Sequence, residues 1–235
     1  LPMAKRFEEL DWAQTPIGEV SLRRRRDPVA DVDVYEVKLN DEYLMSSLFT
    51  VVAEELARIG LAAIAGDDLT VVVGGLGLGY TARAALEDPR VKGLTVVELV
   101  EAVISWHERD LIPDTAGLAS DPRVSLMHAD FFKLVRDGQC PKADVLLVDI
   151  DHSPDNLLHP DNHDLYGVDG LVRVREVLNP GGVFTLWSDD PADSALRDQL
   201  AEVFGDAACL EVAFPNVLTG GTSSNTVYVA GASLL

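Results

Sequence analysis

The sequence predicts an α/β fold in which seven strands form one mostly parallel sheet, preceded by a small N-terminal β segment. Five short apolar runs, rich in β-branched residues, alternate with segments long enough for helices. Two further runs near the C-terminus are joined by a stretch rich in Gly, Ser and Thr, which does not suit a helix. Short strands that lack polar alternation are typical of a parallel sheet covered on both faces.

The composition is that of a globular protein with a strong excess of acids. The 235 residues include 19 Lys and Arg against 39 Asp and Glu, a formal net charge of −20. This charge would repel a phosphate backbone, so no nucleic-acid partner is expected. It is compatible with a cationic small molecule and equally with simple solubility. No apolar run approaches the ~20 residues of a membrane helix. Without a visible secretory leader or a disulfide framework, a cytoplasmic location is expected.

Residues 1–45 are expected to form the N-terminal β segment. Two strands, 17–25 and 32–39, are separated by the turn pair Asp27-Pro28. The run Arg23–Arg26 is predicted to lie on a solvated edge strand, where charge blocks further pairing. Contact with a phosphate or carboxylate is the alternative for these arginines. Since an exposed β segment can pair across two copies, a homodimer is also left open.

Residues 46–235 are expected to form a nucleotide-binding catalytic domain. Ser46-Ser47 is predicted to cap its first helix, whose apolar residues follow at helical spacing. Strands are then predicted over 69–73, 94–98, 124–128, 145–148, 183–187, 210–214 and 226–230, the last two as an antiparallel pair. Alternation of strands with helices indicates a Rossmann-like sheet. Ligands of such sheets bind at the carboxyl ends of the strands.

A glycine-rich loop follows the first of these strands and is predicted to bind a cofactor. Gly75, Gly77 and Gly79 allow a tight turn, and the next helix offers unpaired N–H groups at its start. The spacing Gly-x-Gly-x-Gly differs from the Gly-x-Gly-x-x-Gly of dinucleotide sites, which disfavours a nicotinamide dehydrogenase. A plain tight turn would also explain the loop.

Glu98, Asp130 and Phe131 follow the second and third strands and are further cofactor-binding candidates. Glu98 lies near the distance beyond Gly75 at which an acid binds a ribose diol, and a carboxylate matches two hydroxyls. Asp130 could accept a hydrogen bond from an adenine amine while Phe131 covers the ring. The alternatives are a surface glutamate at position 98 and a helix N-cap at Asp130.

Asp149, Asp151 and His152 follow the fourth strand and are predicted to be catalytic. Carboxylates at this strand end lie where a bound group would react. More acids and histidines occur up to residue 164, so a metal site and a solvated acidic loop are both alternatives. Because the spacing matches no standard ligand set, no metal is predicted.

In their order along the chain, these features resemble the class I S-adenosylmethionine-dependent transferases. Within that class the sequence is most similar to the spermidine synthase family, the polyamine aminopropyltransferases. The resemblance also includes Asp41-Glu42, Leu165-Tyr166 and the turn Leu178–Val183. It implies that the glycine loop holds the donor, with Glu98 on the ribose and Asp130 on the adenine. It also implies that Asp149 faces the attacking amine and accepts its proton.

The sequence departs from that family at three places. The family's loop carries an Asp, which holds the amine of decarboxylated S-adenosylmethionine, where this chain has Gly77. The family's Tyr, His or Gln, and Glu after the Asp-Glu pair are replaced by Met45, Ser46 and Ser47. The family's second active-site Asp is replaced by His152. Losing the loop carboxylate removes repulsion against the carboxylate of intact S-adenosylmethionine.

The sequence therefore predicts a transferase that uses S-adenosylmethionine or its decarboxylated form as co-substrate. Methyl transfer is favoured over aminopropyl transfer, and the acceptor is expected to be a small amine such as a polyamine. A nucleoside-binding protein without catalysis, which keeps the fold for assembly or sensing, is the alternative.

Overall fold

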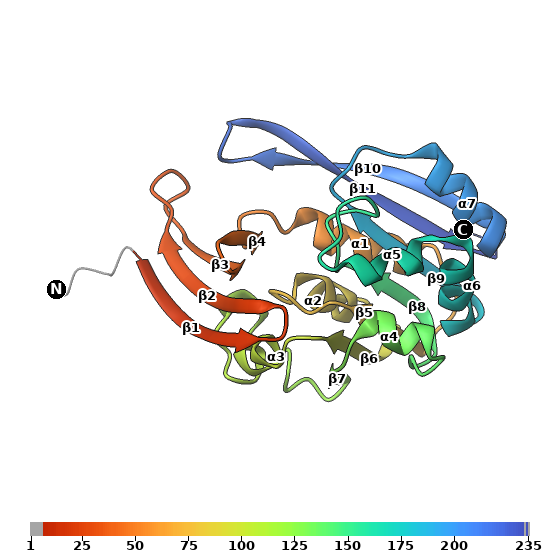
Figure 1. The fold of residues 1–235 in the computed structure, drawn as a ribbon, viewed down its shortest axis with the longest axis horizontal. Coiled ribbons are helices and arrows are strands. Elements are labelled where there is room, and N and C mark those ends of the chain that lie inside the picture. Colours follow the sequence, from red (N-terminus) through yellow and green to blue (C-terminus); the bar gives the residue numbers. More distant parts are fainter. Residues whose placement is uncertain (1–6, 233, 235) are drawn as a thin grey trace.

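The N-terminal β segment forms a sheet of its own. The structure, a computed structural model, describes residues 7–232 and 234, so residues 1–6 of the expected segment lie outside the description. Four antiparallel strands form this sheet in the order β1-β2-β3-β4 (Figure 1). The strands are β1 (Phe7–Thr15), β2 (Gly18–Arg26), β3 (Asp33–Leu39) and β4 (Glu42–Ser46). The two predicted strands correspond to β2 and β3, and the prediction missed β1 and β4.

The arginine run lies in β2, between β1 and β3, so the expectation of a solvated edge strand is wrong. Carboxylates from the neighbouring strands and from the β2–β3 turn meet these guanidinium groups. Glu36, only 4% exposed, lies between two of them. The sheet thus neutralises the run internally, which explains how an interior strand tolerates four positive charges. The ion pairs are Arg23–Glu36, Arg25–Glu36, Arg24–Glu8 and Arg26–Asp31.

The second sheet confirms the predicted architecture. Its seven strands are ordered β10-β11-β9-β8-β5-β6-β7. Strand β11 runs antiparallel to both of its neighbours, and the other pairings are parallel. The strands are β5 (Leu69–Gly74), β6 (Val91–Glu98), β7 (Val124–His128), β8 (Ala143–Val148), β9 (Leu178–Ser188), β10 (Asp206–Asn216) and β11 (Gly221–Gly231).

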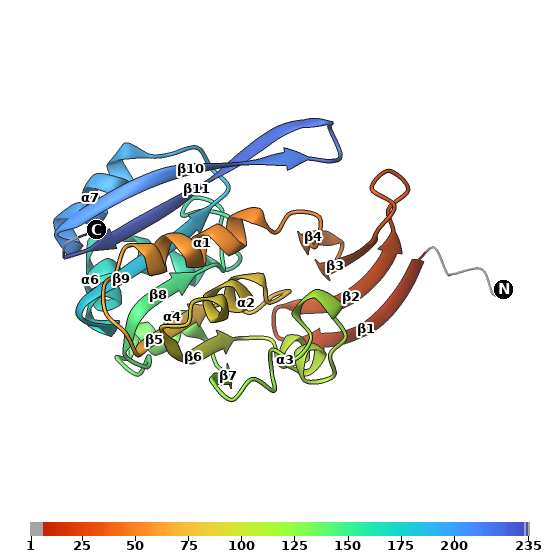
Figure 2. The same ribbon diagram turned by 180° about the vertical axis from the view of Figure 1, so that it is seen from behind.

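Helices cover both faces of this sheet (Figures 1 and 2). Side chains of β5 alternate between the two faces, as in any strand, so Val71 and Val73 belong to one apolar core and Val72 to the other. Both faces are therefore apolar. On the first face lie α1 (Val51–Ala62), α2 (Tyr80–Glu87) and α3 (Glu101–Glu108). On the second lie α4 (Phe131–Arg136), α5 (His163–Tyr166), α6 (Val168–Val177) and α7 (Ser194–Phe204).

The first helix starts later than the sequence suggests. Thr50 is the N-cap residue of α1, and no side chain caps the helix, so the predicted cap at Ser46-Ser47 is wrong. The Ser46 hydroxyl accepts a hydrogen bond from the Leu48 N–H, and the Ser47 hydroxyl accepts one from the Tyr35 N–H. These two serines therefore fix the connection between β4 and α1.

The two sheets share one hydrophobic core. Val20, Leu22 and Val37 of the N-terminal sheet belong to the same buried cluster as the first face of the large sheet. At the join, the Asp11 carboxylate accepts a hydrogen bond from the buried Trp106 indole and pairs with Arg109. This packing holds β4 above the carboxyl ends of the parallel strands. No helix within residues 7–232 is long and apolar enough to cross a bilayer.

Candidate functional site

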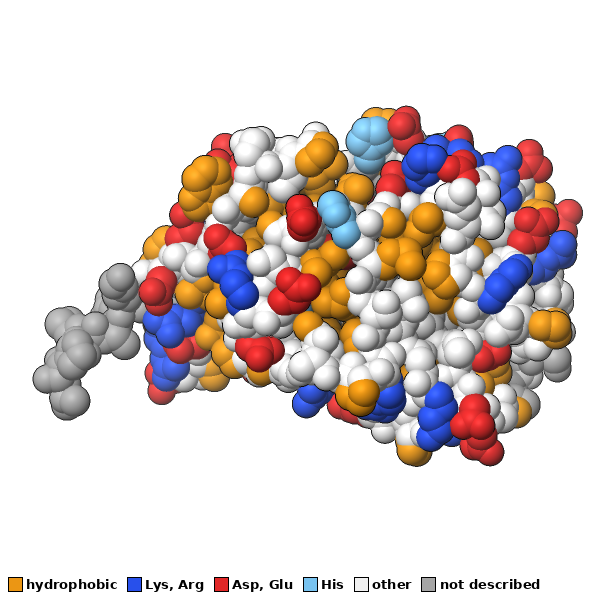
Figure 3. All heavy atoms as spheres, turned by 90° about the horizontal axis from the view of Figure 1, so that it is seen from below, with side chains coloured by type: hydrophobic (Ala, Val, Ile, Leu, Met, Phe, Trp, Pro, Cys, Tyr) orange, Lys and Arg blue, Asp and Glu red, His pale blue; other side chains and the backbone are white. Residues whose placement is uncertain are grey.

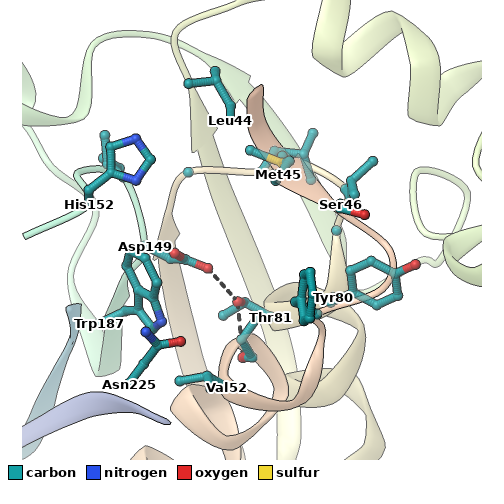
Figure 4. Close-up of a pocket in the computed structure, with 18 of the residues that line it drawn as sticks. Leu44, Met45, Ser46, Val52, Tyr80, Thr81, Asp149, His152, Trp187 and Asn225 are labelled. Carbon is teal, nitrogen blue, oxygen red and sulfur yellow. Dashed lines mark hydrogen bonds between the residues drawn. The ribbon is translucent and has the colours of Figure 1, made fainter. Parts of the chain in front are cut away.

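Two adjoining cavities open at the carboxyl ends of the parallel strands, the place expected for ligands. The first, which we call the Thr81 cavity, has a volume of about 260 Å³ (Figure 4). Its walls come from β4, the glycine loop, the starts of α1 and α2, the ends of β8 and β9, and the hairpin of β10 and β11. Residues used below that line it are Met45, Ser46, Phe49, Val52, Thr81, Asp149, His152, Trp187, Phe214 and Asn225.

The second, the Glu98 cavity, has a volume of about 280 Å³. Five of the six predicted cofactor-binding residues line it: Gly75, Gly77, Glu98, Asp130 and Phe131. Seven residues line both cavities, among them Met45, Gly75, Gly77 and Asp149. A ligand in one cavity and a ligand in the other would therefore meet at the glycine loop and Asp149. One face of the molecule exposes apolar side chains at its centre, with acids and histidines around them (Figure 3).

The glycine loop needs its glycines for two reasons. Gly75, Gly77 and Gly79 have backbone φ values of +95°, +50° and +88°, which residues with a side chain rarely adopt. A β-carbon at Gly75 would overlap the carbonyl oxygen of Asp149, and one at Gly77 would lie 2.6 Å from the Met45 sulfur. The loop thus lies against β4 and the end of β8, and a side chain at Gly77 would require Met45 to move and would adopt a strained φ.

A buried histidine supports this loop from below. His107, 2% exposed, has its Nε2 2.8 Å from the Gly77 carbonyl oxygen, so Nε2 carries the proton of that hydrogen bond. Its Nδ1 is buried and has no hydrogen-bond partner among the residues that the structure describes. Burial lowers the pKa of His107, and the Gly77 bond opposes that effect. A neutral His107 therefore positions the loop, a role that nothing in the sequence signals.

Glu98 lies at the end of β6 and binds the backbone around it. One carboxylate oxygen accepts from the Leu76 N–H at 3.0 Å, the other from the Val100 N–H at 2.8 Å. Each oxygen keeps a second lone pair, so the group can still accept from two hydroxyls. Burial raises the pKa of Glu98, and these backbone hydrogen bonds counteract the rise.

Asp130 and Phe131 lie beside Glu98 in the same cavity. The Asp130 side chain caps α4 by accepting from the Lys133 N–H at 3.1 Å, so the N-cap alternative holds. One oxygen does the capping, which leaves the other for a ligand. Phe131 is 2% exposed and packs its ring against Gly74, where a β-carbon would lie 3.1 Å from the ring. Both residues can therefore serve the predicted role.

Asp149 lies in the wall between the two cavities. Its Oδ2 is 3.1 Å from the Thr81 hydroxyl, which is also 3.1 Å from the Ala53 carbonyl oxygen (Figure 4). The surrounding protein raises the pKa of Asp149 through desolvation, while the Thr81 hydrogen bond and the charge of His152 lower it. A carboxylate with a raised pKa, open to a cavity, is suited to accept a proton near neutral pH.

The other two predicted catalytic residues differ in position. His152 lines the Thr81 cavity, and its Nδ1 lies 4.0 Å from Asp189. Asp151 lines neither cavity: it is 3% exposed and accepts from the Leu158 N–H, the Asn162 amide and the Tyr166 hydroxyl. These three hydrogen bonds tie Asp151 to the loop that follows β8, and its catalytic role stays a prediction.

Sequence reasoning missed Thr81, Trp187 and Asn225. Thr81 follows the glycine loop in the first turn of α2, so the loop itself is a signal for it. Trp187 is the last residue of the predicted strand 183–187, and ligands of such sheets bind at the carboxyl ends of strands. Asn225 had no signal, because only the sheet order brings β11 beside β9. Within the described ranges, no three His, Cys, Asp or Glu side chains converge as a metal site.

Curated relatives match a little over half of the chain. Putrescine N-methyltransferase 3 of Nicotiana tabacum is 29% identical over 130 residues, which is 55% of this chain and 32% of that protein. A polyamine aminopropyltransferase of Mycobacterium tuberculosis is 30% identical over 131 residues, 55% of this chain and 24% of that protein. The matched segments thus span about a third or less of these relatives' length.

Solved structures match the fold over nearly the whole chain. A spermidine synthase in complex with the transition-state analogue AdoDATO gives a TM-score of 0.75 at 18% identity, over 97% of this chain and 74% of that one. The spermidine synthase of Thermotoga maritima gives 0.74 at 17% identity, with the same coverage. Residues 50–218, which contain the glycine loop, Glu98 and Asp149, match the sequence profile of the spermine/spermidine synthase domain. This match covers most of the sequence, and the chain belongs to the spermine/spermidine synthase family.

Proposed function

We propose that this protein transfers a methyl group from S-adenosylmethionine to the nitrogen of a small amine. The observation that carries the proposal is the place of Asp149, a carboxylate with a raised pKa in the wall shared by two cavities. The nucleoside would occupy the Glu98 cavity and the amine the Thr81 cavity. Transfer would take place between them, beside Asp149.

The residues of the Glu98 cavity fit a nucleoside donor. Glu98 has two lone pairs free for the ribose hydroxyls, and Asp130 has a free oxygen for an amino group. Phe131 supplies an apolar wall for a flat ring. The bare backbone of Gly75 leaves space for a ligand to approach the loop closely.

Asp149 makes the amine reactive. An ammonium group has no lone pair, so it must first release a proton, which the Asp149 carboxylate accepts. The nitrogen lone pair then forms the new C–N bond as the C–S bond of the donor breaks. The electron pair of that bond stays on sulfur, and the sulfonium becomes a neutral thioether. The walls of both cavities hold the reacting atoms in line, which displacement requires.

The charge distribution favours a methyl donor over an aminopropyl donor. The aminopropyl chain of the decarboxylated donor carries its own ammonium group. This group needs a carboxylate in addition to the one that pairs with the ammonium group of the acceptor. Among the described residues that line the Thr81 cavity, Asp149 is the sole carboxylate. Gly77, which has no side chain, supplies no second carboxylate at the place where the family carries one. The curated relatives include both methyltransferases and an aminopropyltransferase, so the choice rests on the charges of the cavity.

A side-by-side assay tests the proposal. The purified protein is incubated with S-adenosylmethionine or its decarboxylated form and a panel of primary monoamines and diamines, and products are identified by mass spectrometry. We expect S-adenosylhomocysteine and a methylated amine, both lost in Asp149→Asn. Formation of methylthioadenosine from the decarboxylated donor alone would instead establish aminopropyl transfer. If neither donor is consumed with any amine, the proposal fails.

A further inference from the structure

The Thr81 cavity also restricts the kind of amine that it accepts. We infer that the acceptor is a monoamine with an apolar body, a single ammonium group on an alkyl or arylalkyl chain, and not a diamine or polyamine. This inference rests on the proposed function, since it names the substrate class of the same site. It departs from the acceptors in the relatives' names.

The first argument is the charge balance of the cavity. Although the chain carries 39 acidic residues, the described lining of the Thr81 cavity includes one carboxylate, Asp149. His152, beside it, is either neutral or positive and cannot attract a cation. One ammonium group can therefore be paired. A second would be taken from water without a counter-charge, which costs several kcal/mol.

The second argument is the apolar wall of the cavity. Trp187 at the end of β9, Val52 in α1 and Phe214 in β10 line it, and Phe49 packs edge-on against Phe214 with ring centroids 5.9 Å apart. Such a wall favours apolar ligand surface, which it removes from water. A second ammonium on the Trp187 ring would gain only the cation–π attraction of that ring. This is less than the cost of removing it from water.

The third argument is that the polar lining groups are neutral. Ser46, Thr81 and Asn225 offer hydroxyl and amide oxygens but no charge, and Asn225 lies beside Trp187 on the opposite side of the cavity from Met45 (Figure 4). Each can orient a ligand through one hydrogen bond. None can replace a carboxylate as a partner for an ammonium group.

A matched pair of amines tests the inference by binding. Pentylamine and 1,4-diaminobutane have the same length and differ in one end, a methyl group against an ammonium group. Calorimetry with the protein saturated with S-adenosylhomocysteine should give at least a tenfold smaller Kd for pentylamine. Methyl transfer should show the same order in kcat/KM. Equal or tighter binding of the diamine would overturn the inference.

A variant that adds a carboxylate to the cavity tests whether the charge of the lining sets the choice between monoamine and diamine. Asn225→Asp adds a carboxylate to the cavity wall with almost no change in shape, and should shift the Kd ratio toward the diamine by tenfold or more. The control is Asn216→Asp, which adds the same charge at the tip of the same hairpin, outside the cavity. An unchanged ratio in Asn225→Asp, with both variants folded, would contradict the inference.

The outcomes separate this inference from the proposed function. Methylation of the diamine in preference to the monoamine would keep the proposed function and overturn the inference. Preferential monoamine binding without transfer from S-adenosylmethionine would keep the cavity's selectivity and overturn the proposed reaction.

Discussion

The Thr81 hydroxyl oxygen lies 3.1 Å from Asp149 Oδ2 and 3.1 Å from the carbonyl oxygen of Ala53. A hydroxyl has one proton to donate, so it can serve only one of these acceptors at a time. When Asp149 is ionised, Thr81 can donate to the carboxylate. When Asp149 is protonated, the carboxyl can donate to Thr81, which then donates to Ala53. The pair therefore accommodates both protonation states of the residue proposed as the base.

Thr81→Val is expected to slow the reaction at neutral pH and to shift its pH profile. The hydroxyl lowers the pKa of Asp149, so its loss raises that pKa and moves the acidic limb of the rate–pH profile to higher pH. The rate near pH 7 should fall by about 3- to 10-fold, the equivalent of one net hydrogen bond. Single-turnover rates from pH 5 to 9 measure both effects.

Thr81→Ser is the matched control, because it keeps the hydroxyl and should restore the profile. Melting temperatures identify any loss that comes from the unpaired Ala53 carbonyl. A valine variant with an unshifted profile would show that Thr81 has no effect on Asp149.

Asp149→Asn should stabilise the protein while it abolishes most transfer. Removing a positioned base lowers the rate by about 10²–10⁴. Burial raises the pKa of Asp149 in the folded state, so its contribution favours folding at low pH and is lost as the pH rises from about 4 through that raised pKa. The asparagine variant avoids this loss, so its advantage should be absent at pH 4 and present at pH 8.

Thermal melts at both pH values measure that advantage, expected at about 2–4 °C, or ~1 kcal/mol for a chain of this length. An asparagine variant that is less stable than the parent at pH 8 would mean that the ionised carboxylate stabilises the fold.

Glu98→Gln should weaken donor binding and also loosen the glycine loop. A glutamine has one oxygen, so either the Leu76 or the Val100 N–H would face its NH₂ group. The Kd for S-adenosylhomocysteine should rise by about 10- to 100-fold, since hydrogen bonds to a charged group are worth ~1.5–3 kcal/mol. Calorimetry measures this change.

The control for this variant is Glu101→Gln, an exposed position in the first turn of α3, where the same charge is removed outside the cavity. Equal affinities in Glu98→Gln and the parent protein would exclude Glu98 from nucleoside binding.

Substitutions of Asp151 distinguish an anchor from a catalyst. Asp151→Ala leaves three donors without their acceptor and should destabilise the protein by about 1–3 kcal/mol. Faster amide exchange should be confined to the loop after β8. Asp151→Asn should keep most activity, because its oxygen can replace the acceptor of Leu158 and Asn162 while its NH₂ donates to the Tyr166 hydroxyl. A loss in Asp151→Asn as large as that in Asp149→Asn would place Asp151 in the chemistry.

The large sheet could be predicted because its signals are local. The central strands β5, β6 and β8 each contain a short apolar run; Glu98 ends β6, and Asp149 directly follows β8. The edge strands of the N-terminal sheet lack that signal: β1 mixes charges and aromatic residues, and β4 has only five residues. The place of the arginine run in the sheet was predicted wrongly because its ion-pair partners, including Glu8 and Glu36, come from other strands.

The site was predictable only in part, for the same reason. Asp149 is indicated by its residue type and by its place at a strand end. No local feature distinguishes the partly buried His152, which lines the cavity, from the fully buried Asp151. The cavity wall is assembled from β4, α1, α2, β9 and β11, which are distant in sequence. Trp187 and Asn225 therefore became candidates only once the strand order was known.

The tight contact between Gly75 and the backbone of Asp149 also determines when the site forms during folding. These residues follow β5 and β8, which pair in parallel although β6, β7 and their helices lie between them in the chain. Such distant pairings form late. A chain still crossing the folding barrier has no donor site to occupy. We therefore expect bound donor to slow unfolding without accelerating folding. The donor would then stabilise the protein by lengthening the lifetime of its folded state.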